Sequence, residues 1–317
     1  MNQDFHKKLL FFLNNYTKKL KHENKSINTI NSYKNTINQF IEYILEIDIE
    51  IDFKTIKPSI IYGFFDYKEE KLQKQGNLTL STKRVIIVHL KAFFGYVETE
   101  SSELLDFTNL FKNFKFKTIK QKPKTINEND EIKLLNALEH KKYKQNDFVS
   151  IRDAIILKLM LYSGLRISEV ISLKYKDFID EDENIYSLTV VGKGQKERIV
   201  YINKELIEDE LSELLLQKNK NDFICISKNG KILPRQNIDK MIRSLCSSLN
   251  IKKFSAHKFR HTFANRYVNE LGGNIVHLQE MLGHSDIKTT MIYANPRQED
   301  VKRGYINTIC TKNISKS

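Results

Sequence analysis

Cysteine is scarce in this 317-residue chain, and its spacing carries no metal or disulfide signature. Cys225, Cys246 and Cys310 are odd in number and far apart, and no two of them form a CxxC pair. Such spacing argues against a disulfide framework and against a thiolate zinc site, and it is typical of a reducing compartment. We therefore expect a cytoplasmic protein.

Long hydrophobic runs are missing as well. The most apolar interior stretch, AIILKLMLY, is interrupted by Lys158. The first twenty residues, MNQDFHKKLLFFLNNYTKKL, contain too short an apolar run for a membrane span and no small-residue cleavage site. The sequence therefore predicts a soluble protein without a membrane partner.

The chain carries far more basic than acidic residues. It has 52 Lys and Arg against 39 Asp and Glu, a formal net charge of +13. A surplus of this size makes a polyanion such as nucleic acid the first partner to consider. Lysine, asparagine and isoleucine are abundant together, however, and an AT-rich genome also produces that combination. Charge alone therefore does not decide the partner.

The length favours two domains. Apolar residues recur with helical spacing in SINTINSYKNTINQFIEYILE and in LSTKRVIIVHLKAFFGYVE, where Ser81 or Thr82 could cap the helix. A further helix is expected to start near Pro58. Residues 1–115 are therefore predicted to form a helical domain, and the basic, aperiodic stretch 116–127 reads as a linker.

The remaining residues, 128–317, predict a larger mixed domain. Helical patterns resume in DEIKLLNALEH and SIRDAIILKLMLYSG, and then NIYSLTVVGKGQKERIVYI supplies two β-rich runs around Gly192-Lys193-Gly194. Such runs on either side of a glycine-rich turn are typical of a hairpin. The expected fold class is mainly α with a small antiparallel β-sheet in the second domain, an α+β arrangement of two domains.

Two basic residues stand at exposed junctions of this second domain. Arg166 follows Gly164, which is a good left-handed cap for the preceding helix. Lys193 lies at the hairpin tip between two glycines, where the backbone lets it reach a ligand. Taken singly, each has an ordinary explanation, as a surface ion pair or a solvated lysine.

The segment HKFRHTFANRYVNELGGNIVHLQEMLGHSDIKTTMIYANP contains a denser pattern. On a helix, His257, Arg260 and His261 are spaced i, i+3, i+4 and share one face. Glycines then end two successive helices, so that His284 follows one glycine turn and Tyr293 follows a short third segment. These helix ends predict that His284 and Tyr293 lie on short segments beside the helix face that carries His257.

A metal site and a plain packed core are the alternatives for this segment. His257 and His261 have the spacing of a helical zinc pair, and His284 could be a third ligand. The zincin motif, however, needs a glutamate where this chain has Lys258, and Arg260 would repel a dication. A packed core explains the phenylalanines but gives Arg260 and His284 no role. We therefore expect no metal.

A phosphodiester suits two arginines, a lysine, histidines and a tyrosine without an acidic cluster. Arg166 and Arg260 would neutralise the charge that grows on the phosphate oxygens. Tyr293 would be the nucleophile once His257 accepts its proton, and Lys193 or a histidine would protonate the leaving 5′ oxygen. The tyrosyl ester keeps the bond energy, so no nucleotide cofactor is needed, and the chain has no GxxxxGK[ST] loop.

At this point the chain resembles the tyrosine recombinase (phage integrase) family, most closely its Xer group. SGLRISEV, VVGKGQKERIV, HKFRHTFA and LGHSDIKTTMIYA resemble the four catalytic boxes of that family in order and spacing. The helices of residues 1–115 resemble its core-binding clamp domain, and residues 128–317 its catalytic domain. The resemblance places the catalytic set on Arg166, Lys193, His257, Arg260, His284 and Tyr293.

The resemblance implies a clamp around duplex DNA with inverted-repeat half-sites, a homo- or hetero-tetramer, and a 3′-phosphotyrosine intermediate. A second recombinase or a DNA translocase could be a partner. Lys83 and Arg84 could face the DNA, and Glu169 and His261 match motif positions that look supportive. Resolution of chromosome dimers at a dif-like site, linked to chromosome partition and cell division, is the favoured role. A phage or mobile-element integrase, a type IB topoisomerase and a non-catalytic DNA-binding protein are the alternatives.

Overall fold

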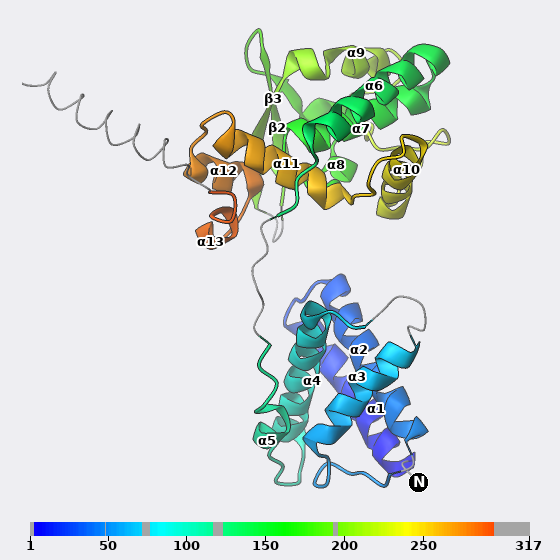
Figure 1. Ribbon diagram of the computed structural model, residues 1–317, viewed down its shortest axis with the longest axis vertical. Helices are drawn as coiled ribbons and strands as arrows, with labels where there is room; N and C mark the ends of the chain where they lie inside the picture. Colours follow the sequence, from blue (N-terminus) through cyan, green and yellow to red (C-terminus); the bar gives the residue numbers. More distant parts are fainter. Residues whose placement is uncertain (1–2, 48, 72–76, 117–122, 193–195, 295–317) are drawn as a thin grey trace, which may run out of the picture. The chain divides into compact units, whose positions relative to one another are not determined.

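The computed structural model describes residues 3–47, 49–71, 77–116, 123–192 and 196–294. The chain divides into two compact units, Met1–Lys120 and Gln121–Ser317 (Figure 1). The border between them lies within the stretch 116–127. Within the described residues, no helix is long and apolar enough to cross a bilayer.

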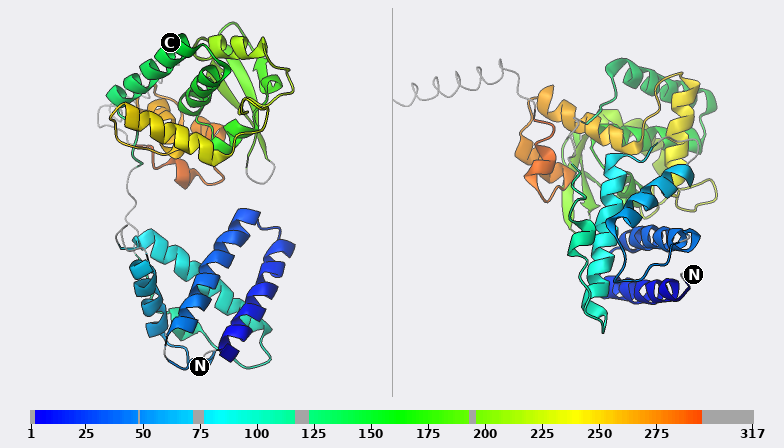
Figure 2. Two further views of the ribbon diagram at one scale, coloured as in Figure 1. Left: turned by 90° about the vertical axis from the view of Figure 1, so that its right-hand side faces the viewer. Right: turned by 60° about the horizontal axis from the view of Figure 1, so that its bottom comes forward.

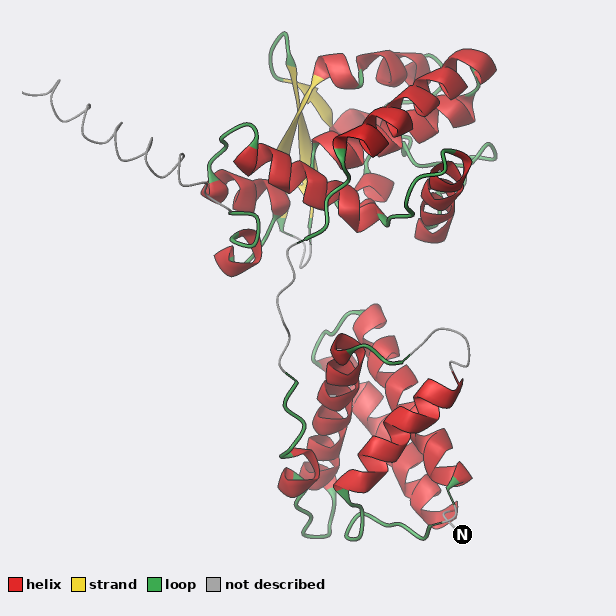
Figure 3. Ribbon diagram, viewed as in Figure 1, coloured by secondary structure: helices red, strands yellow, loops and turns green. Residues whose placement is uncertain are grey.

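The first unit is helical (Figure 3). Its helices are α1 (Gln3–His22), α2 (Ile27–Glu46), α3 (Pro58–Lys71), α4 (Leu80–Glu100) and the single turn α5 (Thr108–Phe111). The stripe of apolar residues that predicted α2 is buried at Ile30, Ile37, Phe40, Ile41 and Ile44. Edge-to-face aromatic pairs such as Phe40–Phe64 and Phe40–Phe94 join α2 to α3 and α4.

Hydroxyl caps set where two of these helices begin. The Ser26 side chain accepts a hydrogen bond from the Thr29 backbone N–H, so α2 begins where the sequence predicts. The expected cap of α4 at Ser81 or Thr82 is wrong. Thr79 is the cap, because its hydroxyl accepts from the Thr82 backbone N–H and the helix therefore starts at Leu80.

The second unit contains a three-stranded antiparallel sheet, β1 (Phe178–Asp180), β2 (Ile185–Val191) and β3 (Glu197–Asn203), in the order β1-β2-β3. The hairpin of β2 and β3 was predicted, and β1 was not. The expected fold class, mainly α with a small antiparallel sheet, is confirmed. The helices of the second unit are α6 (Glu128–Gln145), α7 (Phe148–Tyr162), α8 (Ile167–Ser172), α9 (Glu208–Leu215), α10 (Arg235–Ser248), α11 (Ala256–Asn269), α12 (Ile275–Leu282) and α13 (Ile287–Thr290). Two 3-10 turns, η1 (Tyr175–Asp177) and η2 (Lys204–Leu206), complete its described helical elements.

Helix α7 is the centre of this unit and is buried on nearly every side. It packs against α6, α9 and α11, and the turned views show α6 and α7 lying together (Figure 2). Lys158, which interrupts its apolar sequence, is neutralised by Glu139 and the fully buried Glu210, at 2.7 Å from each. Helix α7 can therefore be buried despite Lys158, and α11 packs against it.

Candidate active site

A glycine turn after α7 sets the position of Arg166. Gly164 has a backbone φ of +65°, and a Cβ at this position would lie 2.3 Å from a ring carbon of Phe263. Only glycine fits both the left-handed backbone and this close approach. The turn brings the Gly164 carbonyl against α11 and leaves Arg166 at the N-cap of α8.

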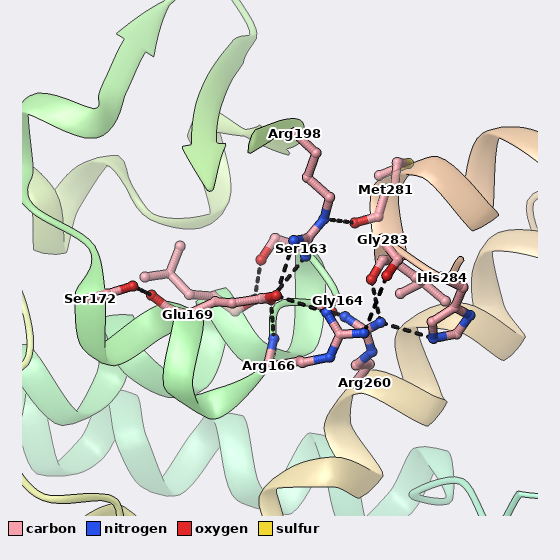
Figure 4. Close-up of polar contacts among 12 residues, drawn as sticks. Ser163, Gly164, Arg166, Glu169, Ser172, Arg198, Arg260, Met281, Gly283 and His284 are labelled. Carbon is pink, nitrogen blue, oxygen red and sulfur yellow. Dashed lines mark hydrogen bonds and ion pairs between the residues drawn. The ribbon is translucent and has the colours of Figure 1, made fainter. Parts of the chain in front are cut away.

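Glu169 is the anchor for two arginines (Figure 4). Its carboxylate is 4% exposed and accepts from Arg166 through the backbone N–H at 2.7 Å and Nη1 at 2.8 Å. It also accepts from Arg198 Nη1 at 3.0 Å and Nη2 at 2.9 Å. Burial raises the pKa of Glu169, but these hydrogen bonds outweigh burial and hold the pKa below its usual value. Glu169 is therefore an ionised support for both guanidinium groups.

Arg198 links the hairpin to the end of α12. Its Nε donates to the Met281 carbonyl at 2.8 Å, while its other nitrogens hold Glu169 (Figure 4). One side chain from β3 therefore connects the segments that carry Arg166 and His284. Sequence reasoning missed Arg198, although its alternation with the buried Val200 and Ile202 places it on the inner face of β3.

Arg260 is a buried cation, with only 1% of its surface exposed. Nη1 donates to the Gly164 carbonyl at 2.8 Å, and Nη2 donates to the Leu282 carbonyl at 2.5 Å and to His284 Nε2 at 3.0 Å. Burial and the neighbouring Arg166 lower the pKa of Arg260 to about 9, so it stays charged at neutral pH. Carbonyl dipoles, rather than a directly bonded carboxylate, satisfy this charge, and the site therefore favours an anion.

His284 is neutral and has a defined tautomer. It follows Gly283, whose φ of +61° ends α12. Since Nε2 accepts from Arg260, Nδ1 carries the proton and donates to the Thr290 hydroxyl at 2.9 Å. Burial, Arg260 and Arg166 lower the pKa of His284 to about 4.

Tyr293 lies in a small apolar cluster and is 4% exposed. Its hydroxyl lies 2.5 Å from His261 Nδ1, and its backbone carbonyl accepts from Asn269 Nδ2 at 3.0 Å. The sequence led us to expect His257 as the partner of this hydroxyl, but the structure places His261 there instead. The His257 ring meets the His261 ring edge-on, with centroids 4.5 Å apart. Burial raises the pKa of Tyr293, and the hydroxyl is protonated at neutral pH.

An open cavity of about 960 Å³ adjoins the arginine cluster. Arg166, Arg198 and His284 line one end, and side chains of β3 and α12 such as Tyr201 and Glu280 line the rest. Tyr293 and His261 are not among the described residues that line it. The cavity is wide enough for a phosphate group to approach Arg166 and His284 from solvent.

The structure thus brings five of the six predicted residues into two adjoining groups. Arg166, Arg260 and His284 form one, and Tyr293 and His257 meet through His261 in the other. Lys193 lies outside the described residues. Within the described part of the chain, no cluster of three His, Cys, Asp or Glu side chains could hold a metal ion.

Lys83 and Arg84, the expected DNA-facing pair, belong to the first unit. Lys83 donates to Glu69 at 2.8 Å and lies over the Phe65 ring, so its charge is already paired within the helical bundle. Arg84 is exposed on α4. Their part in DNA binding stays a prediction.

Comparison with known proteins identifies the class. The sequence pattern of the Phage integrase family matches residues 124–300, and the chain belongs to this family. It is accordingly a tyrosine-type DNA strand transferase, an enzyme that cleaves and rejoins DNA strands. The family resemblance noted in the sequence is confirmed.

Named relatives support the assignment over most of the chain. The chain is 29% identical to the tyrosine recombinase XerD of Listeria monocytogenes over 292 residues, which is 88% of this chain and 92% of that protein. It is 31% identical to the XerD of Staphylococcus aureus over 290 residues, again 88% of this chain and 92% of that protein.

Solved structures share the fold. The XerH site-specific recombinase bound to its difH substrate, before cleavage, superimposes with a TM-score of 0.71 at 24% identity, covering 92% of this chain and 82% of that one. The Tn1549 transposon integrase with circular intermediate DNA gives a TM-score of 0.67 at 19% identity, covering 94% and 99%.

Proposed function

We propose that the protein is a site-specific recombinase that cuts and rejoins duplex DNA at inverted-repeat half-sites through a 3′-phosphotyrosine intermediate. One observation carries the proposal. Arg260 is a fully buried guanidinium bonded to two carbonyls and a neutral histidine, beside a second arginine, and an anion would complete the site. In a strand transferase that anion is the scissile phosphodiester.

Each proposed role follows from the position of the residue. Arg166 lines the cavity and would bind a non-bridging phosphate oxygen, with Glu169 fixing its direction. Arg260 would contribute a field that favours the charge of the transition state. His284, whose Nδ1 donates to Thr290 and whose Nε2 accepts from Arg260, would hold the Arg260 guanidinium in position beside the phosphate. Tyr293 would attack phosphorus.

The proposed roles of Lys193 and His257 rest on the match to the four family boxes. Lys193 or a histidine would supply the proton that the leaving 5′ oxygen needs. His257 stands one helical turn from His261 and next to Arg260, close to where the phosphate charge would lie. Burial, Arg260 and Arg166 lower the pKa of His257, so it enters the reaction as a neutral imidazole.

Resolution of chromosome dimers at a dif-like site is the biological role we favour. It is supported by the XerD relatives, each matched over 92% of its length, and by the likeness to XerH bound to difH. A tetramer on DNA, with a second recombinase or a DNA translocase as partner, belongs to the same proposal. The likeness to the Tn1549 integrase favours a mobile-element integrase as the second candidate.

Covalent capture tests the chemistry and finds the site. The protein is mixed with nicked, sheared chromosomal DNA from its source, the mixture is denatured, and the protein-linked fragments are sequenced. Tyr293→Phe should bind DNA but form no adduct. Tyr201→Phe is the matched control, since Tyr201 is a tyrosine beside the arginine cluster, on the cavity wall, and is 48% exposed. It should keep the adduct.

The sequences recovered separate the roles. Adducts at one inverted-repeat chromosomal locus would support the dimer resolver, and adducts at the ends of a mobile element would support the integrase. An adduct that survives in Tyr293→Phe would show that the nucleophile is another residue.

A further inference from the structure

The Tyr293 hydroxyl has a partner outside the six predicted catalytic residues. His261 Nδ1 lies 2.5 Å from the oxygen, a short hydrogen bond between residues 32 apart in sequence. Within the described chain, this is the one hydrogen bond that the Tyr293 hydroxyl makes. A buried hydroxyl proton needs an acceptor, so the O–H donates and Nδ1 is the unprotonated nitrogen of His261.

The surroundings keep His261 neutral and ready to accept a proton. Burial, with His257 and Arg260 nearby, lowers the pKa of His261 to about 4. The arriving phosphate is negative, and it would offset the field of Arg260. The basicity of His261 would therefore rise when the substrate is in place, which links proton removal to substrate binding.

The contact between the Tyr293 hydroxyl and His261 is also held in place by neighbouring interactions. Asn269, on the same helix, already holds the Tyr293 backbone carbonyl at 3.0 Å, and Leu278 and Leu282 pack around the ring. Helix α11 is in turn held against the buried α7. The hydroxyl is thus fixed against one titratable nitrogen, while His257 is displaced from it by the ring of His261.

We propose that His261 is a further catalytic residue, the group that accepts the Tyr293 proton as the phenolic oxygen attacks phosphorus. The proposal rests on the strand-transfer function proposed above. The bond from Tyr293 Oη to phosphorus forms, the bond from phosphorus to the 5′ oxygen breaks, and the Oη proton moves to His261 Nδ1. The 5′ oxygen takes its proton from a separate acid, Lys193 or a histidine. Rejoining runs the same steps backwards.

The test separates attack from departure of the leaving group. The probe is a nicked duplex of the captured sequence, made once with the ordinary 5′-bridging oxygen and once with sulfur in its place, because a thiolate leaves without an acid. His261→Asn keeps an acceptor near the Nδ1 position but removes the basicity. His140→Asn, an exposed histidine on α6, is the matched control.

The expected result is a loss of adduct formation of about 100-fold or more in His261→Asn, on both substrates, with DNA binding retained. The rate of this variant should rise with pH as solvent hydroxide replaces the missing base. His140→Asn should match the unchanged protein, whose adduct is the independent check on the proposed function.

Three outcomes would overturn the proposal. A rate in His261→Asn within about threefold of the unchanged protein would mean that His261 only holds the ring. Rescue by the sulfur substrate would place His261 on the leaving-group side. Loss on both substrates in His257→Asn but not in His261→Asn would assign the acceptor to His257.

A measurement without DNA covers the case in which the unchanged protein forms no adduct. Tyrosine labelled with 13C at Cζ is incorporated, and the Tyr293 signal is the one lost in Tyr293→Phe. In His261→Asn and His261→Phe that signal should shift, and the pH at which Tyr293 titrates should change. If neither moves, the contact with His261 is absent in solution and the proposal fails, whatever the function of the protein.

Discussion

Replacing Arg198 by methionine should loosen the arginine cluster without touching any predicted catalytic residue. The substitution keeps an unbranched, nearly buried side chain but removes two hydrogen bonds to Glu169 and one to the Met281 carbonyl. Breaking one side of a buried ion pair costs about 3–5 kcal/mol. Because Arg166 still binds Glu169, we expect the lower end, about 3 kcal/mol, for the loss of local stability.

Amide hydrogen exchange followed by mass spectrometry is the assay, since it resolves each helix within the full chain. A loss of about 3 kcal/mol corresponds to roughly hundredfold faster exchange through local opening. The effect should appear in peptides covering α8 and α12, which Arg198 joins. Peptides from α2, in the other unit, serve as the internal standard and should not change.

Two controls separate the cause. Arg198→Lys keeps the charge but not the planar fork, so it should fall between the unchanged protein and Arg198→Met. Arg243→Met makes the same chemical change at an exposed position and should have no effect on α8 or α12. If Arg198→Met shifts exchange in these helices by less than about threefold, the bridge does not stabilise the site and the reasoning is refuted.

Three further predictions concern pH, backbone and salt. His261 and His284 have pKa values of about 4, below their usual 6.5, so the unfolded chain binds more protons between these values. The free energy of unfolding should therefore fall by about 1–2 kcal/mol per histidine from pH 6.5 to 4. The urea midpoint of His261→Gln should fall less over this pH range than that of the unchanged protein, and an equal fall would contradict the prediction. Gly164→Ala should lower the free energy of unfolding by about 2–4 kcal/mol, because the backbone φ is +65° and the new methyl group would meet the Phe263 ring. Gly230→Ala has a φ of +74° but open space around it, so it should lose only the backbone contribution of about 1–2 kcal/mol. Urea unfolding measures both. DNA affinity should drop at least hundredfold between 50 and 200 mM salt, because phosphate contacts release counterions, and a flat titration by fluorescence anisotropy would exclude a basic DNA-binding surface.

Local features of this protein were readable from its sequence. Gly164 and the glycine before His284, Gly283, were expected to end helices, and both adopt a left-handed backbone just after α7 and α12. These boundaries depend on hydrogen bonds and backbone angles within a few residues, which the neighbouring sequence determines. The order of the four boxes likewise indicated the family, and with it the chemistry.

The sequence predicted two local features less well: a short strand and a helix start with several possible caps. Strand β1 has only three residues, too few for a period, and it exists because Phe178 pairs with Leu188 on β2. Three hydroxyl residues, Thr79, Ser81 and Thr82, lie at the start of α4, and Thr79 is the cap in a helix whose buried residues begin at Ile86. For β1, pairing with another strand decided what local preference left open.

The sequence by itself determined the set of groups at the site: two arginines, histidines one turn apart and a tyrosine after two glycine turns. Only the tertiary structure decided their partners. Which of His257 and His261 meets Tyr293 depends on the rotation of α11 against α7 and on where α13 ends, contacts between residues about thirty positions apart. The same holds for Arg198 and Glu169, 29 residues apart, since a hydrogen bond at that separation is set by how the strand and helix pack and not by either local sequence.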